Sequence, residues 1–65
     1  MTATFNYQNK QIKIEFDPIT SHIIVTADDL VLKYIEITEA MFDESDFRNY
    51  VNRMVQNLGV QPQYS

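Results

Sequence analysis

An apolar stripe near the C-terminal end constrains the fold of this chain more than any other feature. Its members recur at the spacing of one helix face, and they are Phe47, Tyr50, Val51, Met54, Val55 and Leu58. Asp43 or Ser45 suits the N-cap position, and Gly59 suits the position just beyond the last helical turn. The stripe therefore predicts one amphipathic helix of about four turns, which must bury its apolar side against another element.

The residues before this helix contain four predicted β-strands. Residues 2–7 and 11–16 alternate between apolar and polar side chains, residues 22–26 are β-branched and apolar, and residues 30–37 are apolar on both faces. Polar turn signals separate them at Asn9, at Pro18 and at Asp28. Short turns favour antiparallel neighbours, so the predicted fold is α+β: a four-stranded antiparallel β-meander followed by one C-terminal amphipathic α-helix packed on one sheet face (ββββα).

The length of the chain allows one domain, which we expect to span residues 1–60, with 61–65 as a flexible C-terminal tail. The chain has no cysteine and one histidine, so we expect no disulfide, no metal site and no cofactor. Good packing and self-association are the remaining ways to stabilise so small a domain.

Parity along the strands predicts which side chains face the helix, provided that every turn preserves the register. The expected inward set is Phe5, Tyr7, Ile12, Ile14, Phe16, Ile23, Val25, Leu30, Leu32 and Tyr34. The same parity gives the opposite face of the sheet an apolar centre and a charged rim. The residues expected at an interface there are Ile24, Val31, Ile35, Ile37, Lys13 and Lys33.

A single helix cannot cover both faces of a sheet, and an apolar centre with a charged rim is typical of an interface. We therefore expect a small non-catalytic protein-interaction or regulatory module. It would associate with itself, as a homodimer, through this second sheet face. A partly solvated face with a few harmless apolar side chains is the alternative interpretation of the same residues.

The acidic residues suggest a different function. Residues 27–46 contain seven acidic side chains and one lysine within a chain of net charge −4. An acidic inhibitor of a nucleic-acid-processing enzyme, of the phage or plasmid antagonist type, is the alternative hypothesis. Direct binding to nucleic acid is not expected, because the chain lacks a basic stripe. We expect no enzymatic activity, because His22 and Glu15 are accompanied by no oxyanion or phosphate loop.

The hydropathy pattern favours a cytoplasmic protein. No apolar run approaches the length of roughly 20 residues that spans a bilayer. Residues 1–4 carry neither the basic nor the apolar segment of a secretion signal, so we expect no membrane partner.

Overall fold

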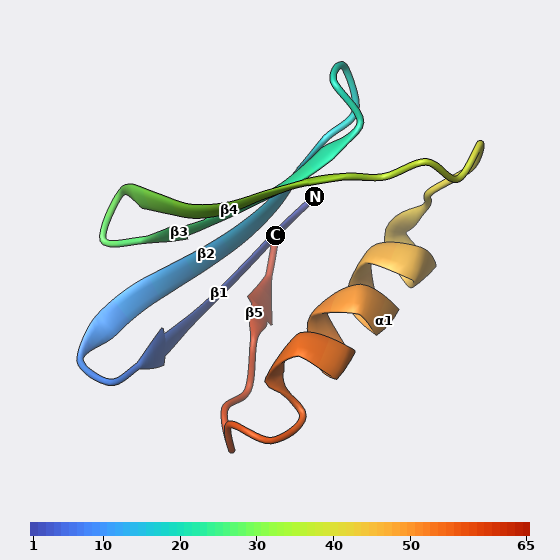
Figure 1. The fold of residues 1–65 in the computed structure, drawn as a ribbon. Coiled ribbons are helices and arrows are strands. Elements are labelled where there is room, and N and C mark those ends of the chain that lie inside the picture. The colour runs from blue at the N-terminus through green and yellow to red at the C-terminus, as the bar shows by residue number, and fades with distance from the viewer.

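A computed structural model describes residues 1–65 as an antiparallel sheet with one helix lying over one of its faces (Figure 1). The helix is α1 (Glu44–Val55). The strands are β1 (Thr2–Tyr7), β2 (Lys10–Asp17), β3 (His22–Ala27), β4 (Leu30–Glu36) and β5 (Gln63–Tyr64). Their order across the sheet is β4-β3-β2-β1-β5, so β4 and β5 form the two edges. The predicted α+β class, antiparallel meander and following helix are confirmed, but the fifth strand was not predicted.

Two hairpins of the meander close through two-residue loops whose backbone is left-handed at both positions. These residues are Gln8 and Asn9, with φ of 51° and 65°, and Asp28 and Asp29, with φ of 48° and 72°. Such loops twist in the same sense as the strands that they join. They fix the registers of β1 on β2 and of β3 on β4 from the turn outward.

Helix α1 begins after Asp43, which is one of the two residues predicted as its N-cap. Its carboxylate accepts a hydrogen bond from the Asp46 amide at 3.0 Å, and the Asp46 carboxylate accepts one from the Asp43 amide at 3.1 Å. This reciprocal capping box satisfies two amides that the helix itself leaves unpaired. The helix has twelve residues and ends at Val55 with Gln56 as its C-cap, so the prediction that it extends to Leu58 and stops at Gly59 is wrong. It is neither long nor apolar enough to cross a membrane.

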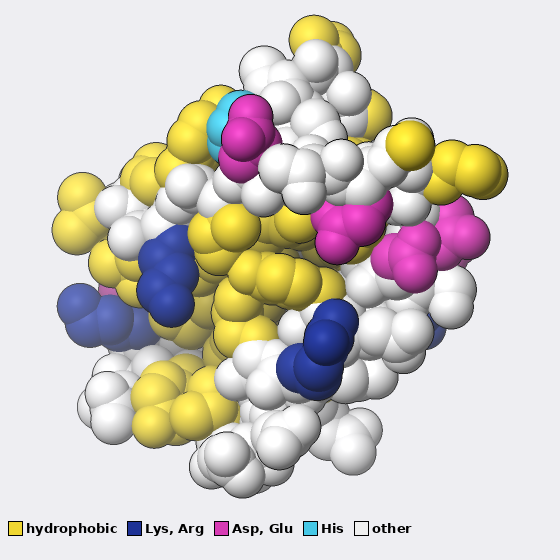
Figure 2. All heavy atoms as spheres, turned by 45° about the vertical axis from the view of Figure 1, so that its right-hand side comes forward, with side chains coloured by type: hydrophobic (Ala, Val, Ile, Leu, Met, Phe, Trp, Pro, Cys, Tyr) yellow, Lys and Arg dark blue, Asp and Glu magenta, His cyan; other side chains and the backbone are white.

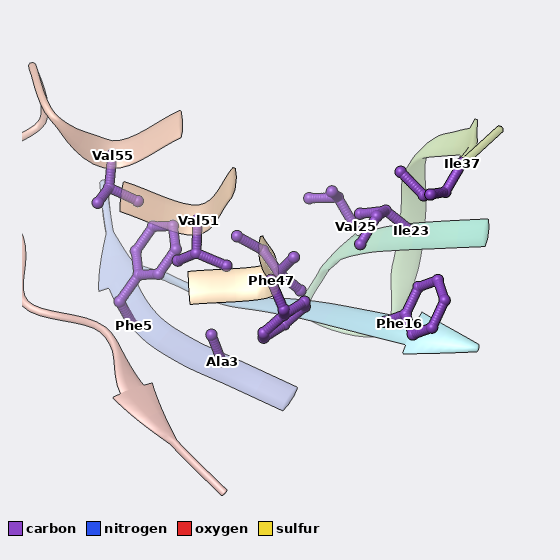
Figure 3. Packing of buried hydrophobic residues seen from close by; sticks show 10 residues of the cluster. Ala3, Phe5, Phe16, Ile23, Val25, Ile37, Phe47, Val51 and Val55 are labelled. Carbon is purple, nitrogen blue, oxygen red and sulfur yellow. The ribbon is translucent and has the colours of Figure 1, made fainter. Parts of the chain in front are cut away.

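The core lies between α1 and the central strands (Figure 3). From the helix, Phe47, Val51 and Val55 point toward the sheet. From the strands and the connection after β4, the buried residues are Ala3, Phe5, Ile14, Phe16, Ile23, Val25, Ala27 and Ile37. The inward parity predicted for the first three strands is therefore confirmed, because Tyr7 and Ile12 also pack against this cluster.

The predicted parity of the fourth strand is wrong beyond its midpoint. Val25 pairs with Lys33 and Thr26 pairs with Val31, so Leu32 has no partner on β3 and forms a β-bulge. One extra residue exchanges the two faces for everything that follows it. Ile35, paired with Ile23, and the buried Ile37 therefore lie on the helix side, whereas Tyr34 joins the opposite face beside Ile24.

The segment expected to be a loose tail contains β5, which pairs antiparallel with β1. Tyr64 is opposite Ala3, whose side chain is completely buried. The Tyr64 ring meets Phe47 edge-on, with 6.4 Å between ring centroids. The chain end thus returns to the sheet, and it adds an aromatic side chain to the core on the β1 side.

Candidate functional site

Strand β4 is an outer strand whose apolar side chains remain in solvent. Leu30, Val31, Leu32 and Tyr34 are 68%, 58%, 55% and 56% exposed, respectively. The outward backbone groups of an edge strand can pair with a strand from another chain. Exposed apolar patches are common at sites of protein contact, so this edge is a candidate site.

A groove opens on the helix side of the sheet between the end of β4 and α1. It has a volume of 550 Å³. Its lining residues are Ile35, Glu36, Ile37, Thr38, Glu39, Phe42, Tyr50, Arg53 and Met54. Figure 2, which turns the helix side of the molecule forward, shows a hollow of hydrophobic side chains with basic and acidic side chains around it. An apolar floor with a charged rim suits a protein segment better than a charged small molecule.

Tyr50 contributes a polar tip to this groove. Partial burial raises the pKa of its hydroxyl above the ordinary value of 10.0, and the positive charge of Arg53 opposes that shift. The hydroxyl is therefore neutral at physiological pH and is available as a hydrogen-bond donor at the wall of the groove.

The second face of the sheet carries fewer apolar side chains than the sequence predicted. The register brings Ile24 beside Tyr34 and Thr26 beside Val31, and Lys13 lies in the same row as Thr26. Lys13 is 3.8 Å from Glu15 on its own strand. The ring of Tyr34 stacks on that of His22, with 4.2 Å between centroids and 16° between planes. This stacking holds Tyr34 in place at the outer edge of the face.

The six residues predicted for the interface are divided between the two faces by the bulge. Ile24, Val31 and Lys13 lie on the second face, as expected. Lys33, Ile35 and Ile37 lie on the helix side, and Ile37 belongs to the core. Four of the six lie on β4 or directly after it, but they do not share one face of the sheet. Their role in an interface stays a prediction.

Several residues of the edge and groove were missed at the sequence level. Leu30, Leu32 and Tyr34 were assigned to the core, and Tyr50 and Met54 were treated only as helix stripe. The available signal was the two-sided apolarity of residues 30–37, which is also what an exposed edge strand with a bulge produces.

The acidic residues of the 27–46 segment have mostly local partners. Asp43 and Asp46 cap α1, and Glu44 accepts a hydrogen bond from Arg48 at 3.1 Å. The Asp28 carboxylate accepts a hydrogen bond from the Gln11 amide at 2.9 Å. The acidic-inhibitor hypothesis stays a prediction, and these contacts give it no support.

Neither the rest of the surface nor the comparison with other proteins identifies a further functional site. No three side chains from His, Cys, Asp and Glu converge to form a set of metal ligands. No family model, no curated protein and no solved structure matches the chain. The β4 edge and the groove are therefore the candidate functional surfaces of the molecule.

Proposed function

We propose that the protein is a small non-catalytic interaction module that associates with itself through the edge of β4. The observation that carries this proposal is the coincidence, on one strand, of a free backbone edge and four exposed apolar side chains. Natural edge strands of this kind are usually short, charged or covered. A partner that adds a strand here satisfies the backbone and removes the apolar surface from water together.

The proposed contact differs from the one expected from the sequence. The second face alone offers Ile24, Val31 and Tyr34, which make a small apolar area. The edge combines this area with Leu30 and with the groove on the other side of the sheet. An interface centred on the β4 edge therefore has apolar contacts on both faces of the sheet.

Light scattering coupled to size-exclusion chromatography tests this proposal. We expect the wild-type mass to rise toward twice that of the chain as the protein concentration rises into the micromolar range. Val31→Lys places a charge on the exposed edge and should weaken association at least about tenfold, since a buried unpaired charge costs more than 1.4 kcal/mol.

Ile19→Lys is the matched control, because Ile19 is 92% exposed in the turn between β2 and β3. It introduces the same charge at an apolar position away from β4 and should leave association unchanged. A wild-type chain that stays monomeric at millimolar concentration, or a dimer that Val31→Lys leaves intact, would contradict the proposal.

A further inference from the structure

The bulge confines the regular part of the β4 edge to the segment after it. Beyond Glu36 the hydrogen bonding continues, because the Ile37 amide donates to the Ser21 carbonyl at 2.8 Å. The Ser21 hydroxyl donates to the Ile37 carbonyl at 2.9 Å. Lys33 to Ile37 is therefore a continuous stretch paired on its inner side, and its midpoint is Ile35.

The direction of these bonds determines which backbone groups point outward. In an antiparallel strand the N–H and C=O of one residue point the same way, and successive residues alternate. Because Ile37 points toward β3, Ile35 and Lys33 do so as well. Tyr34 and Glu36 therefore present their amides and carbonyls to the outside, where a further strand can pair with them.

We infer that the strand pairing with this edge is β4 of a second copy, antiparallel about a two-fold axis at Ile35. This inference rests on the proposed function and specifies its geometry. Tyr34 then exchanges both backbone hydrogen bonds with Glu36 of the second copy, and the reverse pair does the same. The two sheets join into one, with both helices on the same side.

The side chains favour this arrangement on the helix side of the sheet. The two Ile35 side chains meet at the axis, beside the groove lined by Ile37, Tyr50 and Met54. An isologous contact of this type uses the same patch twice, so an apolar patch at the axis is buried against itself. The mouth of each groove is covered by the strand of the other copy.

When two copies of β4 pair antiparallel, the basic residue of each copy lies near acidic residues of the other. Lys33 is its single basic residue, Glu36 is its last residue, and Glu39 lies in the connection to α1. Antiparallel pairing about Ile35 places Lys33 opposite Ile37 of the second copy and diagonal to its Glu39. Parallel pairing in register would instead place each of these charges beside its like.

Disulfide trapping tests this register directly, because the chain has no cysteine of its own. Residues facing each other at a non-hydrogen-bonded antiparallel pair have Cα atoms about 4.5 Å apart, which a disulfide can bridge. Under mild oxidation we expect Ile35→Cys to give a covalent dimer. Ile24→Cys, on the second face, and Ile19→Cys, in a distant turn, should remain largely monomeric in denaturing gels.

A charge exchange supplies a second test that does not depend on cysteine geometry. Lys33→Glu should weaken the dimer about tenfold by bringing like charges together at two symmetric places. The double variant Lys33→Glu with Glu39→Lys should restore the wild-type dissociation constant. Both residues are exposed, so circular dichroism should report an unchanged fold.

The outcomes separate this register from the broader proposal. A dimer that Val31→Lys dissociates, but that crosslinks through Ile24→Cys and not through Ile35→Cys, would overturn the register and keep the self-association. Loss of crosslinking together with failure of the double variant to restore binding would also overturn the register. A chain that is monomeric at millimolar concentration overturns both.

Discussion

The two sides of the sheet differ in how far their backbone groups and side chains are covered. The first half of β1 is covered by the last residues of the chain: Ser65 donates its amide to the Thr2 carbonyl at 3.0 Å, and Thr2 donates back at 3.3 Å. Arg48 lies over the Tyr64 ring at 4.3 Å, and the Tyr64 hydroxyl bonds Asn52 at 3.3 Å. The β4 edge has no such cover, although it is more apolar.

The difference indicates where each edge gains its stability. The β1 edge is stabilised from within the chain, by a short strand and by aromatic contacts with α1. Leu30 to Tyr34 of β4 lie outside the core that α1 covers, and the apolar side chains there stay exposed. The bulge at Leu32 and the charge of Lys33 discourage nonspecific strand pairing, but they leave the apolar side chains of β4 exposed.

Among the variants that compare the two sides, a truncation in the core should lower the free energy of unfolding most. Phe47 is 1% exposed beneath Tyr64, and Phe47→Ala should lower the free energy of unfolding by about 3–5 kcal/mol. That loss is comparable to the whole stability of a domain of this size, so we expect unfolding to be complete at low urea.

Leu30→Ala is the control for that truncation on the open side. Leu30 is 68% exposed, and the monomer should lose no more than about 0.5 kcal/mol in urea denaturation followed by circular dichroism. Destabilisation of the monomer as large as that of Phe47→Ala would mean that β4 is already packed, and the comparison would fail.

Removing Gln63–Ser65 should have the next largest effect. The deletion takes away the backbone pairing with β1 and the Tyr64 ring, and should cost roughly 2 kcal/mol. It also exposes the backbone groups of Thr2 to Thr4, so we expect new association that Val31→Lys does not suppress. Light scattering of the deletion with and without Val31→Lys would reveal it, and a deletion variant that behaves as wild type would show that β5 closes nothing.

A substitution within the closed edge separates its aromatic contacts from its hydroxyl. Tyr64→Leu removes the ring that meets Phe47 and Arg48, and should cost about 1 kcal/mol. Tyr64→Phe loses only an exposed hydrogen bond and should cost a few tenths. Equal losses in thermal denaturation would assign the closure to the hydroxyl instead.

The smallest expected effect is on stability and comes from Asp43, the N-cap of α1, which contacts neither edge of the sheet. Hydrogen bonds from the Asp46 amide lower the pKa of Asp43 below its ordinary value of 3.8. A lowered pKa stabilises the folded state above pH 3.8, and that contribution is lost as the pH falls through the folded-state pKa.

Asp43→Asn keeps a capping oxygen but removes this charge. We expect a slightly lower melting temperature at pH 7 and convergence with the wild type as the pH falls below 3.8, through the folded-state pKa of Asp43. Association through β4 should be unchanged at pH 7. A change in association would mean that general stability, and not the edge itself, controls the dimer.

The predictable part of the fold came from patterns that repeat. The helix stripe and the alternation in the first three strands were confirmed, because each contains several residues that agree on one face. Asp43 was predictable as an N-cap because its chemistry is local.

The unpredictable part came from single residues. Residues 30–35 are apolar at five of six positions, so parity could not reveal that Leu32 is an extra residue. Strand β5 has two residues and follows Pro62, which gives no periodic pattern. It forms because Tyr64 pairs with Ala3 and its ring packs edge-on against Phe47. Both contacts require the rest of the sheet and the helix to be in place. The same bulge explains why half of the predicted interface lies on the other face.

The unpaired Leu32 also determines how this chain can change in length during divergence. Loss of a single codon between Val31 and Lys33 would remove the bulge and turn Ile37 away from the core. Surface loops tolerate deletions of this kind, whereas here one deletion would exchange two faces of a strand. We therefore expect related chains to vary the side chains of β4 more readily than its residue count, and to place insertions after Ile37 instead.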